Sequence, residues 1–209
     1  MLGEHYGGVL GSDCFSAYNT LSAFAKQKCL THYERAAKNI EKFYPHDQPA
    51  CIFAVRLKDI LKRARQAKRD WIAGVIDNEE ANHAVKDFAK ELDQLLETPL
   101  ENRDAGNLLN RLLTHRDENF TFLRYKEVAP NNNRAERALR PSVVMRKITY
   151  GNNAKTGARN HEILMSLVET AKLHIKNTDA GLLEMMMALA LAKNPTEIKH
   201  TIFGYQNTS

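Results

Sequence analysis

The clearest pattern in the sequence is a series of apolar stripes at helical spacing in the middle of the chain. In residues 52–71, 79–96 and 105–118, apolar side chains recur every three to four positions, which is typical of helices with one buried face. Pro99 separates the last two segments, because proline breaks a helix. We therefore predict an all-helical insertion over residues 46–120.

Two short segments near the N-terminus predict strands. Residues 7–12 read GGVLGS and residues 26–30 read KQKCL, and residues 16–24 between them have the pattern of a helix. A crossover of about a dozen residues is the shortest connection that joins two parallel strands. These runs predict a parallel pair, and the whole chain is expected to be α/β but mostly α.

Three different elements are expected directly after the insertion. The run FTFLRY within residues 120–130 predicts a strand. The run RAERALR predicts a short helix that Pro141 stops. Residues 142–150 alternate partly between apolar and polar side chains, which favours an extended segment.

Two further helices are expected towards the C-terminus. Residues 158–174 carry an apolar stripe, which includes Ile163 and Leu164 and is expected to face inward. Residues 180–192 are apolar on nearly every side, so this helix is expected to be buried or to lie at an interface.

Composition places the chain among ordinary globular proteins. Of its 209 residues, 43% are hydrophobic and 26% are charged. No apolar run approaches the roughly 18–20 residues of a membrane span, and the N-terminus lacks the pattern of a signal peptide. We therefore expect a cytoplasmic protein without a membrane partner. The three cysteines are irregularly spaced, so a disulfide framework is not expected.

The basic residues are concentrated in two segments. The formal net charge is +5, which permits nucleic-acid binding without requiring it. Residues 56–69 hold seven basic side chains and one acid, and residues 134–159 hold seven basic side chains and Glu136 as their one acid. Both segments are therefore candidates for contact with DNA phosphates.

Asp13 follows the first predicted strand directly. A carboxylate at the end of a strand is a suitable ligand for Mg²⁺, which prefers oxygen donors on a rigid element. An aspartate just before a helical segment is also a common N-cap, and that alternative explains the residue without any metal. The residues around Asp13 leave both interpretations open.

Glu136 lies among arginines, between an asparagine-rich turn and Pro141. An exposed glutamate paired with Arg140 four positions later would have the same sequence pattern. The alternative is a site where a metal ion meets phosphate, because arginine binds phosphate oxygens in bidentate fashion. The phosphate-binding candidates are Arg134, Arg137, Arg140, Arg146 and Lys147.

Cys29 and His32 form a CxxH pair. A structural zinc site needs about four ligands, and no second pair occurs at suitable spacing, since His46 and Cys51 are irregularly placed. We expect Cys29 and His32 to be structural residues and not zinc ligands.

Three blocks of this sequence together resemble the insertion sequence 66 family of bacterial transposases. The blocks are GGVLGSDCFSAYNTL at 7–21, KQKCLTHYER at 26–35, and NNNRAERALRPSVVMRKITYGNNAKTG at 131–157 with SLVETAK at 166–172. They occur in the family's order, with a helical insertion between the second and the third.

The resemblance implies a partial RNase H-like core with a catalytic triad of two aspartates and one glutamate. Asp13 matches the second aspartate and Glu136 the glutamate, and both would bind Mg²⁺ or Mn²⁺. The implied division is residues 1–45 and 121–209 for the core and 46–120 for the insertion.

The first aspartate of the family lies upstream of anything present here, so the chain is expected to be the C-terminal portion of a transposase, truncated at its N-terminus. The implied partner is the DNA of transposon ends, and the expected activity of this chain alone is little or none. The alternative is a non-catalytic DNA-binding or assembly fragment that self-associates or pairs with full-length transposase.

Overall fold

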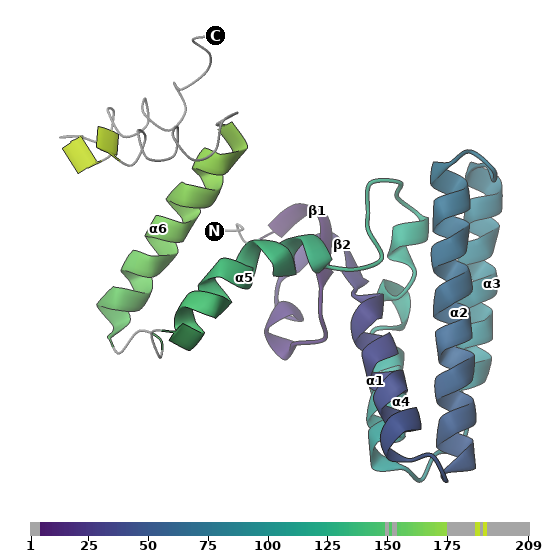
Figure 1. The fold of residues 1–209 in the computed structure, drawn as a ribbon. Helices are drawn as coiled ribbons and strands as arrows, with labels where there is room; N and C mark the ends of the chain where they lie inside the picture. The colour runs from purple at the N-terminus through teal and green to yellow at the C-terminus, as the bar shows by residue number, and fades with distance from the viewer. Residues whose placement is uncertain (1–4, 149–150, 152–153, 175–186, 189, 192–209) are drawn as a thin grey trace. The chain divides into compact units, whose positions relative to one another are not determined.

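A computed structural model of the chain describes residues 5–148, 151, 154–174, 187–188 and 190–191 (Figure 1). The chain divides into two compact units, Met1–Asn133 and Arg134–Ser209. The expected α/β fold that is mostly α is confirmed at this level, because helices dominate and the described strands form one small parallel sheet. The expected division at residues 45 and 120 stays a prediction.

The first unit opens with a two-stranded parallel sheet. Strand β1 (His5–Ser12) pairs with β2 (Ser22–Lys28), and Ser12 lies opposite Lys28 at the carboxyl end of the sheet. The parallel pair is confirmed. The predicted helix over residues 16–24 is wrong, because only the 3-10 helix η1 (Ser16–Tyr18) forms before β2 begins at Ser22. The alternation of side chains along β2, which favours a strand over a helix, was the signal for its true start.

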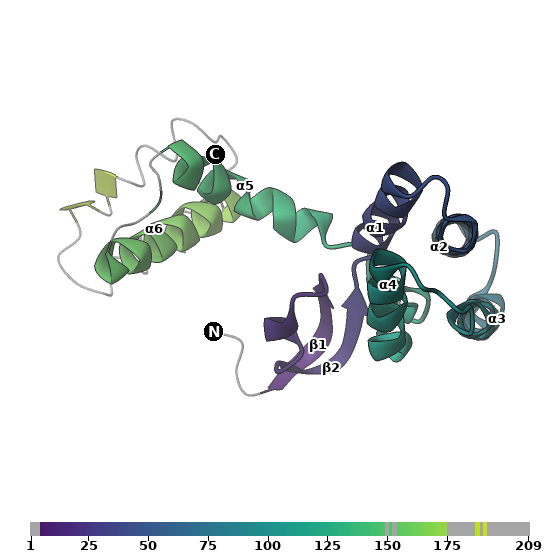
Figure 2. The ribbon, with the colours of Figure 1, turned by 90° about the horizontal axis from the view of Figure 1, so that it is seen from below.

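Four helices follow the sheet and pack together (Figures 1 and 2). They are α1 (Leu30–Phe43), α2 (Gln48–Ile72), α3 (Asn78–Leu96) and α4 (Arg103–Thr114). The last three confirm the helices that the apolar stripes predict. The sequence reasoning missed α1, although its buried side chains also recur at helical spacing, at Leu30, Tyr33, Ala37 and Ile40.

Local signals set the ends of these helices. The carboxylate of Asp47 accepts a hydrogen bond from the backbone N–H of Ala50 and caps α2, and Asn102 caps α4 in the same way. Asp77 and Glu80 form a capping box at the start of α3. Gly74 follows the end of α2 at a φ of 75°, a left-handed conformation that favours glycine.

The core of the first unit lies among α1–α4 and includes one further apolar segment. That segment is the 3-10 helix η3 (Thr121–Leu123), whose Phe122 and Leu123 are fully buried. The strand predicted in FTFLRY is therefore wrong. Its backbone groups are satisfied by side chains from elsewhere: Gln27 accepts the N–H of Phe122, and the ammonium of Lys68 contacts the carbonyl oxygens of Phe122 and Tyr125.

The second unit contains helices α5 (Asn133–Ile148) and α6 (Lys155–His174), the first of which begins at the last residue of the first unit. Pro141 does not stop the helix, and residues 142–148 are helical instead of extended. Proline removes its own N–H donor and its ring crowds the carbonyl group four residues earlier, but both effects are local, and the helix continues through Pro141. Both predictions about this segment were wrong.

Helix α6 confirms the helix predicted over residues 158–174. Its Ile163 and Leu164 are exposed, so the expectation that they face inward is wrong. Most of the predicted helix over residues 180–192 lies outside the described residues. None of the described helices is long and apolar enough to cross a membrane.

Candidate functional site

Asp13 lies at the carboxyl end of β1, as the first residue after the strand. It is half-buried, and its Oδ1 accepts a hydrogen bond from the backbone N–H of Phe15 at 2.9 Å. The side chain of Asp13 therefore forms a short turn with the backbone N–H two residues later. Because η1 begins at Ser16 and Phe15 occupies its N-cap position, Asp13 is not a helix N-cap. Asp13 is therefore fixed at the end of the sheet by its own turn.

The turn that carries Asp13 accepts hydrogen bonds from the ammonium group of Lys28, a residue that is fully buried. Lys28 Nζ lies 3.2 Å from Ser12 Oγ, 3.3 Å from the carbonyl oxygen of Asp13 and 3.3 Å from Asn19 Oδ1. These three acceptors come from both ends of the connection between β1 and β2. One lysine at the end of β2 therefore holds the whole loop on which Asp13 lies.

A carboxylate balances this buried charge. Glu118 Oε2 lies 3.5 Å from Lys28 Nζ and 3.5 Å from His115 Nδ1. Burial lowers the pKa of His115, and the positive charge of Lys28 lowers it further, against a smaller opposite effect of Glu118. His115 is therefore neutral at neutral pH, so Lys28 and Glu118 form the charged pair.

The sequence reasoning missed Lys28, His115 and Glu118. The signal that could have identified them is the position of Lys28 at the buried carboxyl end of β2. A buried lysine requires a charged partner. The partner lies 90 positions away in the sequence, and no spacing pattern identifies it.

Side-chain hydrogen bonds also attach β2 to the segment after α4. Gln27 Nε2 donates to the carbonyl oxygen of Asn119 at 3.1 Å, and the hydroxyl of Thr121 donates to the carbonyl oxygen of Lys26 at 2.7 Å. Both contacts join residues more than 90 positions apart. They make the carboxyl end of the sheet a rigid platform, which is the kind of support that a catalytic carboxylate needs.

Cys29 connects this platform to the asparagine-rich turn. Its side chain is buried at the N-cap position of α1, and its Sγ accepts a hydrogen bond from the backbone N–H of Asn132 at 3.5 Å. The N–H of Leu30 donates to the carbonyl oxygen of Pro130 at 3.0 Å. The chain therefore leaves the first unit at the same end of the sheet at which Asp13 lies.

The position of Cys29 gives it a structural use in the first unit. His32 is in the first turn of α1, where its N–H donates to the carbonyl oxygen of Cys29. Among the residues that the structure describes, no group of three or more histidine, cysteine, aspartate or glutamate side chains is arranged to hold a metal ion. That Cys29 and His32 are not zinc ligands stays a prediction.

Glu136 lies in the first turn of α5, within the second unit. Arg134, Arg137 and Arg140 are exposed on the same helix, and Arg146 and Lys147 lie in its last turn. The N-terminal turn of a helix favours anions, so phosphate groups suit this end of α5.

Asp13 and Glu136 belong to different units, and each is placed within its own unit only. Their expected approach to within about 10 Å of each other, as two ligands of one metal site, therefore stays a prediction.

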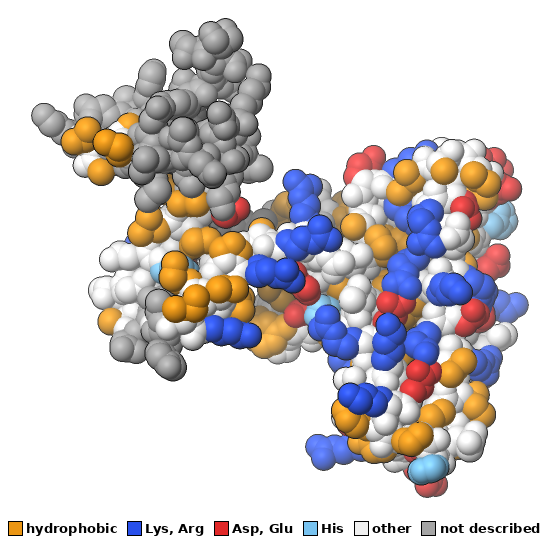
Figure 3. Space-filling model, in the orientation of Figure 1, with side chains coloured by type: hydrophobic (Ala, Val, Ile, Leu, Met, Phe, Trp, Pro, Cys, Tyr) orange, Lys and Arg blue, Asp and Glu red, His pale blue; other side chains and the backbone are white. Residues whose placement is uncertain are grey.

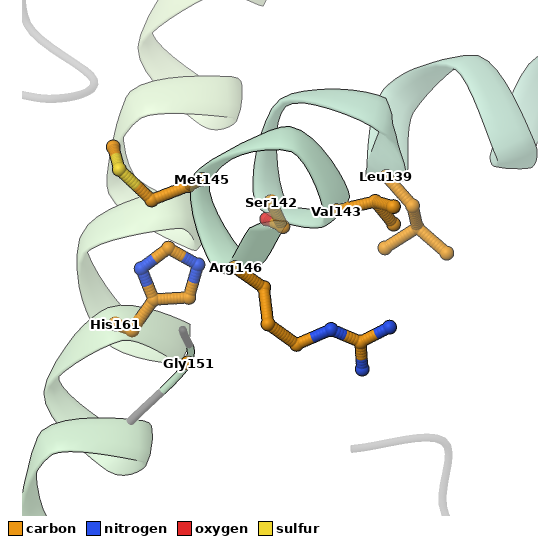
Figure 4. A pocket seen from close by; sticks show the side chains of 7 residues that line it. All are labelled: Leu139, Ser142, Val143, Met145, Arg146, Gly151 and His161. Carbon is orange, nitrogen blue, oxygen red and sulfur yellow. The ribbon is translucent and has the colours of Figure 1, made fainter. Parts of the chain in front are cut away.

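The second unit has a small cavity between α5 and α6 (Figure 4). Its volume is about 220 Å³, and its lining residues are Leu139, Ser142, Val143, Met145, Arg146, Gly151 and His161. This volume is below the roughly 300 Å³ at which small-molecule sites begin. None of the described residues that line the cavity is a carboxylate, so this part of the lining does not resemble a metal or phosphoryl-transfer site.

Comparison with known proteins bears on the three sequence blocks. The model of the protein family described as "Transposase IS66 family" matches residues 1–160, a span that contains both Asp13 and Glu136. A search of curated proteins and a search of solved structures each found no match. The family match covers more than half of the chain, and the chain therefore belongs to the insertion sequence 66 family of transposases.

Proposed function

We propose that this chain takes part in metal-dependent DNA cleavage and strand transfer at transposon ends, with Asp13 and Glu136 as two of the catalytic carboxylates. The observation that carries the proposal is the hydrogen bonding of Pro130 and Asn132 to the start of α1. This contact brings the chain to the carboxyl end of the sheet, beside the strand after which Asp13 lies. Glu136 follows Asn132 by four residues, a span of at most about 14 Å.

The donor chemistry of the site fits a magnesium or manganese ion. Asp13 offers a carboxylate on a rigid strand end, with one oxygen engaged by the N–H of Phe15. Mg²⁺ is commonly bound by one or two protein carboxylates together with substrate phosphates, so a large cluster of protein ligands is not required. When bound, the ions would activate a water or a 3′-hydroxyl and stabilise the leaving oxygen of the scissile phosphate.

The remaining residues have positioning roles in this proposal. The ammonium group of Lys28 contacts backbone and side-chain oxygens of the loop that carries Asp13, and Glu118 balances its charge. Arg134, Arg137 and Arg140 would bind phosphate oxygens of the DNA next to Glu136. The β1–β2 pair with Asp13 at its carboxyl end is consistent with part of an RNase H-like sheet, and residues 46–120 with its helical insertion.

A catalytic triad of two aspartates and one glutamate needs a third carboxylate. We propose no residue of this chain for that position. We therefore expect the chain by itself to perform little or no strand transfer. A second candidate function, assembly with another transposase chain, is favoured by the sheet itself. The sheet contains β1 and β2 alone among the described residues, and four of the eight residues of β1 are exposed, so the edge of β1 that faces away from β2 can pair with a further strand.

The metal site can be tested without catalytic activity. Fe²⁺ bound in place of Mg²⁺ reduces added hydrogen peroxide to hydroxide and a hydroxyl radical, with ascorbate returning Fe³⁺ to Fe²⁺, and the radicals cut the polypeptide near the metal. We expect cuts near both residue 13 and residue 136, and we expect Asp13→Asn or Glu136→Gln to abolish both sets. The matched controls Asp87→Asn and Glu162→Gln, at exposed positions on α3 and α6, should leave the cuts unchanged. Cuts near only one of the two carboxylates would contradict a shared site.

Assembly can be tested by sedimentation of the chain over a range of micromolar concentrations. The exposed edge of β1 predicts a concentration-dependent increase in mass. A monomer at every concentration would contradict the proposal of self-association and would leave the metal-site proposal untouched.

A further inference from the structure

Helices α1 and α2 form an antiparallel pair that two ion pairs hold in register. Lys58 Nζ lies 2.6 Å from Glu41 Oε2, and the guanidinium of Arg65 forms a bidentate pair with Glu34. These contacts place residue 41 beside residue 58 and residue 34 beside residue 65. The register between them follows from helical geometry, because both helices rise by the same distance per residue.

Midway between the two ion pairs, this register sets two lysines opposite each other. Lys38 is four positions after Glu34, and Lys62 is four positions after Lys58, so each lies on the side of its helix that carries the ion pairs. Both side chains are exposed, and neither forms an ion pair with any of the described residues. The nearest carboxylates on α1, Glu34 and Glu41, are already paired with Arg65 and Lys58, and Asp59 on α2 is paired with Arg63. The two facing lysines therefore repel each other without a carboxylate of their own, and their arrangement is not explained by stability of the fold.

The surroundings of the two lysines are also basic. Arg69 continues the stripe of α2 about two turns beyond Lys62, while Arg35 and Lys42 are exposed on α1. We define the basic face by the five exposed cations Arg35, Lys38, Lys42, Lys62 and Arg69. Figure 3 shows Lys and Arg side chains gathered along the part of the surface that α1 and α2 form.

The opposite sign of charge occurs on α3. Helices α1 and α2 contribute seven basic side chains and two acids to this side, counting the two ion pairs, whereas α3 carries five acids and two lysines. The first unit is therefore electrostatically polar, and a polyanion is attracted to the α1–α2 side. From Lys58 to Arg69 the stripe extends over about 16 Å, which matches roughly five phosphate steps of one strand when they are measured along the axis of duplex DNA.

We propose that the basic face binds the phosphate backbone of duplex DNA, with Lys38 and Lys62 gripping one stretch of the strand between them. The inference rests on the proposed function, in that DNA is the polyanion. It goes beyond it by assigning DNA contact to the helical part of the first unit, apart from the arginines around Glu136. Contacts of this kind are made to phosphates, so the surface supplies affinity and orientation without sequence specificity.

The test measures binding of the full chain to a 20-base-pair duplex by fluorescence anisotropy, at salt concentrations between 50 and 200 mM. The variant Lys38→Gln/Lys62→Gln/Arg69→Gln removes three charges from the basic face. The matched control Lys86→Gln/Lys90→Gln/Arg103→Gln removes three exposed charges from α3 and α4. Glutamine is a good helix former, and both variants change the net charge equally.

Each phosphate contact contributes about 0.9 to the slope of the logarithm of the binding constant against the logarithm of salt concentration. We expect the basic-face variant to reduce the slope by up to about 2.7, which corresponds to as much as about 500-fold weaker binding at 0.1 M salt. The control should keep the wild-type slope. The melting temperature of the basic-face variant should equal or exceed that of the wild type, since a like-charge contact is removed, and this excludes unfolding as the cause.

Three outcomes would overturn the inference. The first is a loss of slope that is equal in the variant and the control, because net charge alone would then explain binding. The second is wild-type binding by the basic-face variant together with loss in Arg134→Gln/Arg137→Gln/Arg140→Gln, which would leave the proposed function intact. The third is a wild-type chain that binds no duplex at 50 mM salt, in which case radical cutting at residues 13 and 136 still decides the metal site separately.

Discussion

Replacement of Lys28 by methionine tests how the candidate site is supported. Methionine is close to lysine in length and fills the same buried space, but it removes the ammonium group. Ser12, Asn19 and the carbonyl of Asp13 then lose a donor, and Glu118 loses its counter-charge. The variant therefore removes the charge at the centre of the platform while the apolar packing is largely kept.

The expected cost follows from burial. Loss of one partner from a buried ion pair costs about 3–5 kcal/mol, because the remaining charge is left without compensation. The side chain of Glu118 is 26% exposed and can regain some water, so we expect the lower end, about 3 kcal/mol. For a unit of this size, that corresponds to a decrease in melting temperature of about 10 °C.

Tryptophan fluorescence is the appropriate assay. The chain has one tryptophan, Trp71, which is buried in the first unit with its Nε1 donating to Asn78 Oδ1 at 2.9 Å. Its emission therefore reports the unfolding of the unit that contains Lys28. The second variant, Glu118→Gln in the Lys28→Met background, should recover at least about 1 kcal/mol, since the uncompensated carboxylate is then neutral.

Two results would refute this reasoning. One is a Lys28→Met variant whose free energy of unfolding lies within about 0.5 kcal/mol of the wild type, the range of ordinary surface substitutions. The other is strict additivity of the Lys28 and Glu118 substitutions, because residues in one ion pair should be coupled.

Three further predictions concern the first unit. Burial lowers the pKa of Lys68 to about 8, so between pH 8 and about 10.5 the unfolded chain holds a proton that the folded chain has released. Urea titrations should therefore show that the free energy of unfolding of the wild type, relative to that of Lys68→Met, rises with pH in this window. A difference in free energy that does not change with pH would contradict this prediction. Asp77→Ala removes the capping box of α3 and should cost about 1 kcal/mol, whereas Asp87→Ala, in mid-helix, should cost less. Leu57→Ala opens a cavity at a fully buried position and should cost about 3–4 kcal/mol by chemical denaturation; a loss below about 1 kcal/mol would contradict the described core.

The helices α2, α3 and α4 were predictable because each has one apolar face of regular period, and that period is a property of consecutive residues. The same signal was present in α1 and was overlooked. Pro141 shows the opposite error, since the local tendency of proline to end a helix was treated as decisive while the chain on both sides stays helical.

Of the candidate site, the sequence was sufficient to locate Asp13 after a strand and Glu136 in a helix, and to indicate the family. Both placements depend on residues that are neighbours along the chain. The support of the site was not predictable, because the charge of Lys28 is balanced by Glu118, and the N–H of Phe122 is accepted by Gln27, at separations of 90 to 95 positions.

By itself, therefore, the sequence determined the periodic helices, the parallel strand pair and the membership of a transposase family. Tertiary structure alone decided that Lys28 is buried beneath Asp13 and that residues 121–123 form a 3-10 helix instead of a strand. The physical reason is the same in both cases. A buried charge or an unpaired backbone group must find a partner, and the partner is whichever residue folding brings near, at any distance along the chain.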